Sequence, residues 1–140
     1  MSETIHATCV AIGGRGVLLG GRPGRGKSDL ALRLIDRGAH LVSDDYTELC
    51  TVDGRLVARA PARIAGRMEI RGVGLVEIAA APEAPICLFA DLDLPPERLP
   101  EPASRRIAGQ DVPTIALAAL EPSAPLKLER ALLLFGLPPA

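Results

Sequence analysis

The stretch from Gly20 to Leu34, "GGRPGRGKSDLALRL", constrains the fold of this chain more than any other. Residues 21–28 satisfy the P-loop pattern G-x-x-x-x-G-K-[ST]. An apolar run over residues 17–21 suits a buried strand, and the apolar residues after Lys27 recur at helical spacing. Glycines let backbone N–H groups converge on phosphate oxygens, and the helix offers its N-terminus to the same anion. The pattern predicts an α/β protein with a phosphate loop between a strand and a helix; the alternative is a glycine-rich turn that binds no nucleotide.

Each residue type in this loop has its own expected role. Lys27 is expected to reach the β- and γ-phosphates of a nucleotide, and the Ser28 hydroxyl to bind Mg²⁺. The side chains of Arg22 and Arg25 are interpreted as solvent-exposed charge, and Pro23 lacks an N–H that could serve as a phosphate donor. The loop residues expected to surround the nucleotide are Gly21, Arg22, Pro23, Gly24, Arg25, Gly26, Lys27 and Ser28.

Composition excludes several classes of protein. The chain has 140 residues, which suits a single domain over residues 1–140, and its 2% aromatic content predicts an aliphatic core. A net charge of -1 and the scarcity of aromatic rings argue against a nucleic-acid partner. The apolar runs are too short for a membrane helix, and the start of the chain has no signal-peptide pattern. Three separated cysteines favour a reducing, cytoplasmic location over a disulfide framework or a zinc cage.

The rest of the chain predicts strands and one further helix. Residues 95–113 are interpreted as a polar, proline-marked excursion, and a helix is expected from a cap at Ser123 to a stop near Gly136. Strands are predicted over Thr4–Ile12, from His40, around a turn at Asp53-Gly54, over Ala84–Leu94 and over Thr114–Leu120.

Acidic residues beside the loop are candidates for chemistry. Asp44 and Asp45 follow an apolar run and should lie at the carboxyl end of a strand, where open α/β sheets bind ligands. Adjacent side chains on extended backbone point in opposite directions, so one carboxylate could face a metal and the other an acceptor. The alternative is an Asp pair that caps a turn. Glu69 and Arg71 would share one face of an extended segment, either as site residues or as an exposed ion-paired strand.

Four segments in this order resemble the catalytic C-terminal domain of the HPr kinase/phosphorylase family. They are "IHA" (Ile5–Ala7), "GGRPGRGKS" (Gly20–Ser28), "RGAHLVSDD" (Arg37–Asp45) and "MEIRGVGLVEI" (Met68–Ile78). The resemblance spans residues 5–80 and weakens beyond them. It implies a P-loop kinase domain of the HPr kinase and phosphoenolpyruvate carboxykinase type. It also implies transfer of phosphate from ATP, with Mg²⁺, to a seryl hydroxyl of the phosphocarrier protein HPr or of a nitrogen-branch paralogue.

The resemblance also implies roles for individual residues. Asp45 matches the residue that takes the seryl proton, and His6, which alone would be taken for a structural histidine, matches an active-site histidine. Arg98 matches a catalytic arginine, the alternative being plain surface charge. The catalytic set implied is His6, Lys27, Asp45 and Arg98, and the metal-binding set is Ser28, Asp44 and Glu69.

Three departures from the family pattern qualify these expectations. Pro23 replaces the loop's usual serine. The N-terminal domain of the long members has no counterpart, as in short alphaproteobacterial forms, and oligomers like the hexamers of the long members stay an open expectation. The late P-x-x-P-G-R segment is replaced by residues 121–131, so kinase rather than phosphorylase activity is expected. Two alternatives stay open, namely a non-catalytic nucleotide-sensing module and a P-loop kinase for a small molecule.

Overall fold

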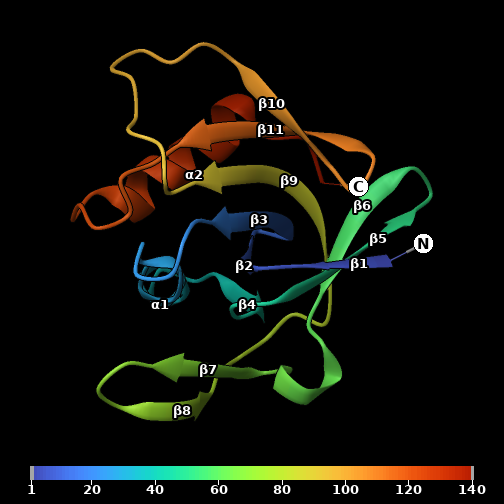
Figure 1. The fold of residues 1–140 in the computed structure, drawn as a ribbon, viewed down its shortest axis with the longest axis vertical. Coiled ribbons are helices and arrows are strands. Elements are labelled where there is room, and N and C mark those ends of the chain that lie inside the picture. The colour runs from blue at the N-terminus through green and yellow to red at the C-terminus, as the bar shows by residue number, and fades with distance from the viewer. Residues whose placement is uncertain (1, 140) are drawn as a thin grey trace.

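The computed structural model describes residues 2–139, which form a large mixed sheet, a small hairpin sheet and two helices (Figure 1). The helices are α1 (Lys27–Asp36) and α2 (Ala124–Phe135), with a short 3₁₀ turn η1 (Ala62–Ile64). The strands of the large sheet are β1 (Ser2–Ile5), β2 (Ala7–Ile12), β3 (Arg15–Gly20), β4 (His40–Ser43), β5 (Thr47–Val52), β6 (Arg55–Arg59), β9 (Ala84–Asp91), β10 (Ala103–Ile107) and β11 (Gln110–Ala116). The small sheet pairs β7 (Arg67–Ile70) with β8 (Gly74–Glu77).

The large sheet has the order β1-β5-β6-β9-β3-β2-β4, and β11 joins it beside β9 with β10 outside it. Strands β3, β9 and β11 run parallel, with Gly20 and Ala116 both opposite Asp91. Their arrowheads point to the side of the molecule where α1 lies (Figure 1). The loops that follow these three strands therefore gather at the start of α1, the edge at which parallel sheets bind ligands.

Helix α1 begins where the glycine-rich loop ends. Gly26 precedes it with φ of 91°, a left-handed conformation that favours glycine. Leu30, Ala31 and Leu34 are buried at helical spacing, so one stripe of the helix faces the sheet. Gly38, with φ of 110°, follows the last turn and donates its N–H to the Ile35 carbonyl at 3.0 Å. The predicted helix and both of its boundaries are confirmed.

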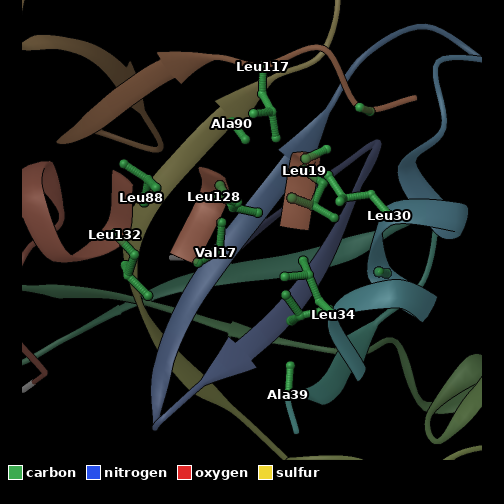
Figure 2. Close-up of a cluster of buried hydrophobic side chains, with 14 of the residues drawn as sticks. Val17, Leu19, Leu30, Leu34, Ala39, Leu88, Ala90, Leu117, Leu128 and Leu132 are labelled. Atoms are coloured by element: carbon green, nitrogen blue, oxygen red, sulfur yellow. The ribbon is translucent and has the colours of Figure 1, made fainter. Parts of the chain in front are cut away.

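The core is aliphatic and lies on both faces of the central strands. Val17 and Leu19 of β3 face α1 and α2, where they contact a cluster that includes Leu30 and Leu128 (Figure 2). The intervening Leu18 belongs to a second cluster on the opposite face of the sheet. This alternation buries β3 on both sides, which explains why its sequence is a continuous apolar run.

Three sequence-based predictions about local structure are wrong. The strand expected over Thr4–Ile12 is interrupted at His6, because β1 pairs with β5 whereas β2 pairs with β3 and β4. Residues 95–113 contain β10 and the first part of β11, joined by a turn at Ala108-Gly109 in which both residues have positive φ. Arg71 lies in the turn after β7, so it does not continue the face that carries Glu69.

Other local predictions are confirmed. Asp53 and Gly54 form the turn between β5 and β6, with φ of 50° and 78°. Helix α2 ends at Phe135, directly before Gly136, and Ser123 occupies the N-cap position but makes no side-chain cap hydrogen bond. Neither of the two helices within residues 2–139 combines the length and the apolar character needed to cross a membrane.

Candidate active site

Lys27 holds a buried positive charge inside the glycine-rich loop. Its side chain folds back over the loop, and Nζ donates to the carbonyl oxygens of Gly21 at 2.6 Å and Arg22 at 3.4 Å. The residue is only 6% exposed, and no acidic side chain in residues 2–139 forms an ion pair with it. A buried ammonium group held by carbonyls alone favours an anionic ligand, because a charge in low dielectric gains most from a counter-charge.

The N–H groups of the loop divide into two sets. The Arg22 N–H donates to both carboxylate oxygens of Asp93, at 3.1 and 3.2 Å, and the Arg25 N–H donates to the Arg22 carbonyl at 3.2 Å. Pro23 thus lies between Arg22 and Arg25, whose N–H groups already have protein acceptors. The other set is different: within the described residues, no protein acceptor is hydrogen-bonded to the N–H groups of Gly24, Gly26, Lys27 or Ser28. These donors can form the phosphate cradle.

Asp93 anchors the outer side of this loop. It forms ion pairs with the guanidinium groups of Arg22, at 3.4 Å, and Arg25, at 3.2 Å, both of which are largely solvent-exposed. Its own N–H donates to the Asp91 carboxylate at 2.9 Å. Both aspartates lie at the carboxyl end of β9, the type of position that singled out Asp44 and Asp45, so the same reasoning could have found them.

Asp44 is a buried carboxylate between three elements. Its Oδ1 accepts hydrogen bonds from Ser28 Oγ at 2.7 Å and Thr8 Oγ1 at 3.3 Å, and its Oδ2 accepts the N–H of Glu69 at 3.3 Å. Asp44 is 8% exposed. The carboxylate therefore ties the start of α1 to β2 and to the β7–β8 hairpin. Thr8 was not among the residues singled out from the sequence, because its partner lies 36 residues away along the chain.

The oxygens of Ser28 and Asp44 fit a hard cation such as Mg²⁺, which binds through one or two carboxylates together with substrate phosphates and water. No cluster of three or more His, Cys, Asp or Glu side chains arranged for a metal occurs within residues 2–139. A cation here would therefore take ligands from a nucleotide as well. Glu69 reaches Asp44 only through its backbone, and its side chain lies on the exposed side of β7, opposite the buried Met68.

Asp45 points away from Asp44 and toward solvent. Its φ of 67° is left-handed, and its N–H donates to Thr8 Oγ1 at 3.0 Å. Its side chain is 54% exposed and lies 2.8 Å from Nε2 of His6, which donates to the carboxylate. The His6 ring also stacks on Tyr46, with centroids 5.0 Å apart and planes at 23°. The two carboxylates therefore lie in different surroundings: that of Asp44 is buried beside Ser28, and that of Asp45 is accessible beside His6.

A hollow of about 550 Å³ opens beside His6. His6, the first residues of the P-loop and strand β10 contribute to its walls. In its wall Arg105 pairs with the buried Asp91 at 2.7 Å and lies 4.4 Å from the centre of the Phe89 ring. Sequence reasoning missed Arg105 because it interpreted this segment as an excursion without strands.

Arg98 lies elsewhere. It is exposed in the loop between β9 and β10, does not line the hollow, and makes no side-chain hydrogen bond or ion pair within the described residues. Its catalytic role stays a prediction.

A phosphate loop between a buried parallel strand and a helix, with a carboxylate–hydroxyl pair at the helix start, defines a P-loop nucleotide-binding protein of the α/β class. The family model described as the HPr Serine kinase C-terminal domain matches residues 1–82, and the chain belongs to this family.

Curated relatives agree with this assignment. HPr kinase/phosphorylase of Clostridium beijerinckii is 40% identical over 74 residues, which is 53% of this chain and 24% of the relative. The enzyme of the same name from Peptoclostridium acidaminophilum is 49% identical over 78 residues, which is 55% of this chain and 25% of the relative. The match thus spans about a quarter of the length of these relatives.

The fold also matches a solved structure. The Hpr(Ser) kinase/phosphatase from Coxiella burnetii superimposes with a TM-score of 0.80 at 29% sequence identity, over 91% of this chain and 87% of that one. The expected P-loop kinase fold of the HPr kinase type is confirmed, and the match extends well beyond the part of the chain that resembles the family in sequence.

Proposed function

We propose that the chain is an ATP-dependent protein-serine kinase whose acceptor is HPr or a nitrogen-branch paralogue of that phosphocarrier protein. Family membership and the names of its relatives support this class of activity. The observation that carries the proposal is that the neighbouring carboxylates of Asp44 and Asp45 face different surroundings. Asp44 is buried beside the P-loop serine, whereas Asp45 is accessible to a second protein and is oriented by His6.

In this proposal the loop binds the phosphates of ATP. The N–H groups at the start of α1 and the Lys27 ammonium group bind the β- and γ-phosphate oxygens, for which Lys27 exchanges its two carbonyl acceptors. Ser28 and Asp44 would hold Mg²⁺, and the metal would neutralise charge that develops on the transferring phosphoryl group. Glu69 would join them as a ligand by turning its side chain from the exposed face of β7. Arg98 would contribute further positive charge if the β9–β10 loop closes over the nucleotide.

Asp45 acts on the acceptor. Its carboxylate accepts the proton of the seryl hydroxyl while the seryl oxygen forms a bond to the γ-phosphorus and the bond from that phosphorus to the ADP oxygen breaks. His6 donates a hydrogen bond to the same carboxylate and orients it toward the incoming serine. The products are a phosphoserine and ADP, and the proton resides on Asp45 until it passes to solvent.

The proposal extends to the setting of the enzyme. We place it in the cytoplasm as a single catalytic domain over residues 1–140, consistent with three free cysteines, and with kinase rather than phosphorylase activity. We also propose that several copies assemble, as in the long family members, which light scattering of the purified chain measures.

The experiment is incubation of the purified chain with ATP, Mg²⁺ and an HPr-type protein, followed by intact-mass and fragment-mass measurement of the acceptor. The expected result is one added phosphoryl group on a serine. An acceptor that stays unmodified, while the chain binds ATP, would favour a nucleotide-sensing module; phosphorylation of a metabolite instead would favour a small-molecule kinase.

A further inference from the structure

The two ends of the P-loop face different surroundings. Its first residues, Gly20–Pro23, border the hollow that His6 also lines. Its last glycine, Gly26, meets the loop that follows β11: a Cβ added to Gly26 would lie 2.9 Å from Leu120 Cδ2 and 3.5 Å from Ala119 Cβ. The phosphate cradle therefore lies between the hollow that His6 lines on one flank and an apolar side chain on the other.

Leu120 is an exposed leucine held in a fixed place. It is 72% exposed, whereas its neighbour Ala119 is buried. Arg33 of α1 donates from its two Nη atoms to the carbonyl oxygens on either side of Leu120, those of Ala119 and Glu121, the latter at 3.1 Å. The guanidinium group is itself paired with Asp29 at 3.0 Å. The sequence thus fixes the backbone around an apolar side chain that the core does not use.

The geometry of phosphoryl transfer indicates which flank of the P-loop receives the acceptor serine and which receives the rest of the nucleotide. In phosphoryl transfer the attacking and leaving oxygens lie roughly in line on opposite sides of the γ-phosphorus. Under the proposed function the serine enters beside Asp45 and His6, on the side of the hollow. The ADP leaving group must then extend away from that pair, along the loop toward Gly26 and Leu120.

We propose that Leu120 is the platform for the nucleoside of ATP: its side chain packs against the face of the base, while Arg33 holds it in position. Because Arg33 holds the backbone around Leu120 before binding, only the leucine side chain has to be ordered when the base covers it, and covering it removes apolar surface from water. This inference rests on the proposed function, because the assignment of the flanks uses Asp45 as the acceptor-side base.

The test compares ATP with inorganic tripolyphosphate, which has the same phosphate chain and no nucleoside. Calorimetric titration of the wild-type chain with each ligand in Mg²⁺ gives the reference affinities. Leu120→Ser is expected to weaken ATP binding about tenfold, because it removes the free energy gained by burying one leucine side chain partly against the base. Tripolyphosphate binding should be unchanged. Leu120→Phe should restore or strengthen ATP binding, because an aromatic ring stacks on a base.

Leu133→Ser is the matched control. Leu133 is 68% exposed near the end of α2, and the next residues of the chain lie against Arg15 at the opposite end of β3 from the P-loop. This variant should bind both ligands as the wild type does. Equal effects of Leu120→Ser on both ligands, or no effect on either, would overturn the inference while the proposed function stands. A wild-type chain that binds neither ligand would overturn both.

Discussion

Nε2 of His6 lies 2.8 Å from the carboxylate of Asp45, although 39 residues separate them in the sequence. The chain changes sheet partners at His6: β1 pairs Ile5 with Thr47, and β2 pairs Cys9 with Ser43, so His6 lies across from the segment between β4 and β5 that holds Asp45. The left-handed backbone of Asp45 turns its side chain out toward the histidine, whereas Asp44 stays buried. The break in the first strand and the unusual φ of Asp45 thus serve the same site.

Asp45→Asn should abolish phosphoryl transfer and leave ATP binding nearly unchanged. Asparagine tolerates the left-handed conformation that Asp45 adopts, so the backbone is preserved while the proton acceptor is lost. Loss of a general base lowers a rate by about 100-fold or more. Rate measurements with HPr, together with calorimetric ATP titration, test this. Transfer at the wild-type rate would exclude Asp45 as the base.

His6→Gln should reduce transfer less than Asp45→Asn does. Glutamine can still donate a hydrogen bond to Asp45, but it does not reproduce the stacking on Tyr46, so the carboxylate is less well oriented. A reduction in kcat with little change in the KM for ATP is expected in steady-state kinetics. A loss of transfer as large as that of Asp45→Asn would mean that His6 acts on the reacting atoms directly.

Asp93→Asn should weaken ATP binding by loosening the first half of the P-loop. The amide keeps one acceptor for the Arg22 N–H but loses the charge that holds Arg22 and Arg25. The pairs are largely exposed, so an effect of only a few-fold on affinity is expected. Glu129→Gln is the control, because Glu129 forms a comparably exposed ion pair with Arg37, beyond the other end of α1. Equal effects of the two variants on ATP affinity would argue against an anchoring role for Asp93.

Alkylation should distinguish the cysteines. Burial raises the pKa of the Cys9 thiol, so Cys9 stays a neutral, unreactive thiol in the folded chain at any ordinary pH. Cys50 is partly exposed, with its sulfur 3.3 Å from a guanidinium nitrogen of Arg59. Iodoacetamide at mildly alkaline pH should label Cys50 first and Cys9 only after unfolding, as peptide mass mapping can show. Labelling of Cys9 at the rate of Cys50 in the folded chain would contradict this.

The raised pKa of Cys9 also determines whether its contribution to folding stability rises or falls with pH. Since the folded thiol of Cys9 has the higher pKa, its contribution to stability is complete below the ordinary thiol pKa and falls as pH rises above it, because the unfolded state then gains the thiolate. Denaturant unfolding of the wild type and Cys9→Ala at neutral and alkaline pH should show a steeper alkaline loss for the wild type.

Leu34→Ala should destabilise the fold by about 2–5 kcal/mol, because Leu34 is fully buried between α1 and the sheet. Denaturant unfolding followed by circular dichroism measures the loss. Leu133→Ala, which removes an exposed side chain from α2, should change the free energy of unfolding by less than about 0.5 kcal/mol. A similar loss in both variants would show that Leu34 is not part of the core.

Local signals in the sequence predicted the parts of the fold that local chemistry determines. The P-loop, helix α1 and the position of Asp44 and Asp45 after β4 each depend on residues close together in the chain. The charged edge strand β10 escaped prediction because Ser104, Arg105 and Arg106 give no apolar alternation, although β11 pairs with it. Exposed edge strands often carry charged side chains, which prevent pairing with another chain. A sequence pattern that depends on burial does not detect such strands.

The site itself depends on contacts between distant segments. The sequence identified Ser28 and Asp44 but not Thr8, whose hydroxyl bridges Asp44 and the backbone of Asp45. Asp93 follows a strand as Asp44 and Asp45 do, but its contact with the Arg22 N–H, 71 residues away in the sequence, is visible only in the fold. Single residues at strand ends become a site only when sheet order brings the strand ends together, and sheet order is a long-range property of the chain.

The most direct measurement is the ratio of phosphoserine formed on HPr to ADP released, followed in one reaction with ATP and Mg²⁺. If Asp45 takes the proton of an acceptor serine, the ratio is one throughout the reaction and ADP release stops when HPr is omitted. ADP released without phosphoserine, or at the same rate without HPr, would contradict the assignment of this site as a protein-serine kinase.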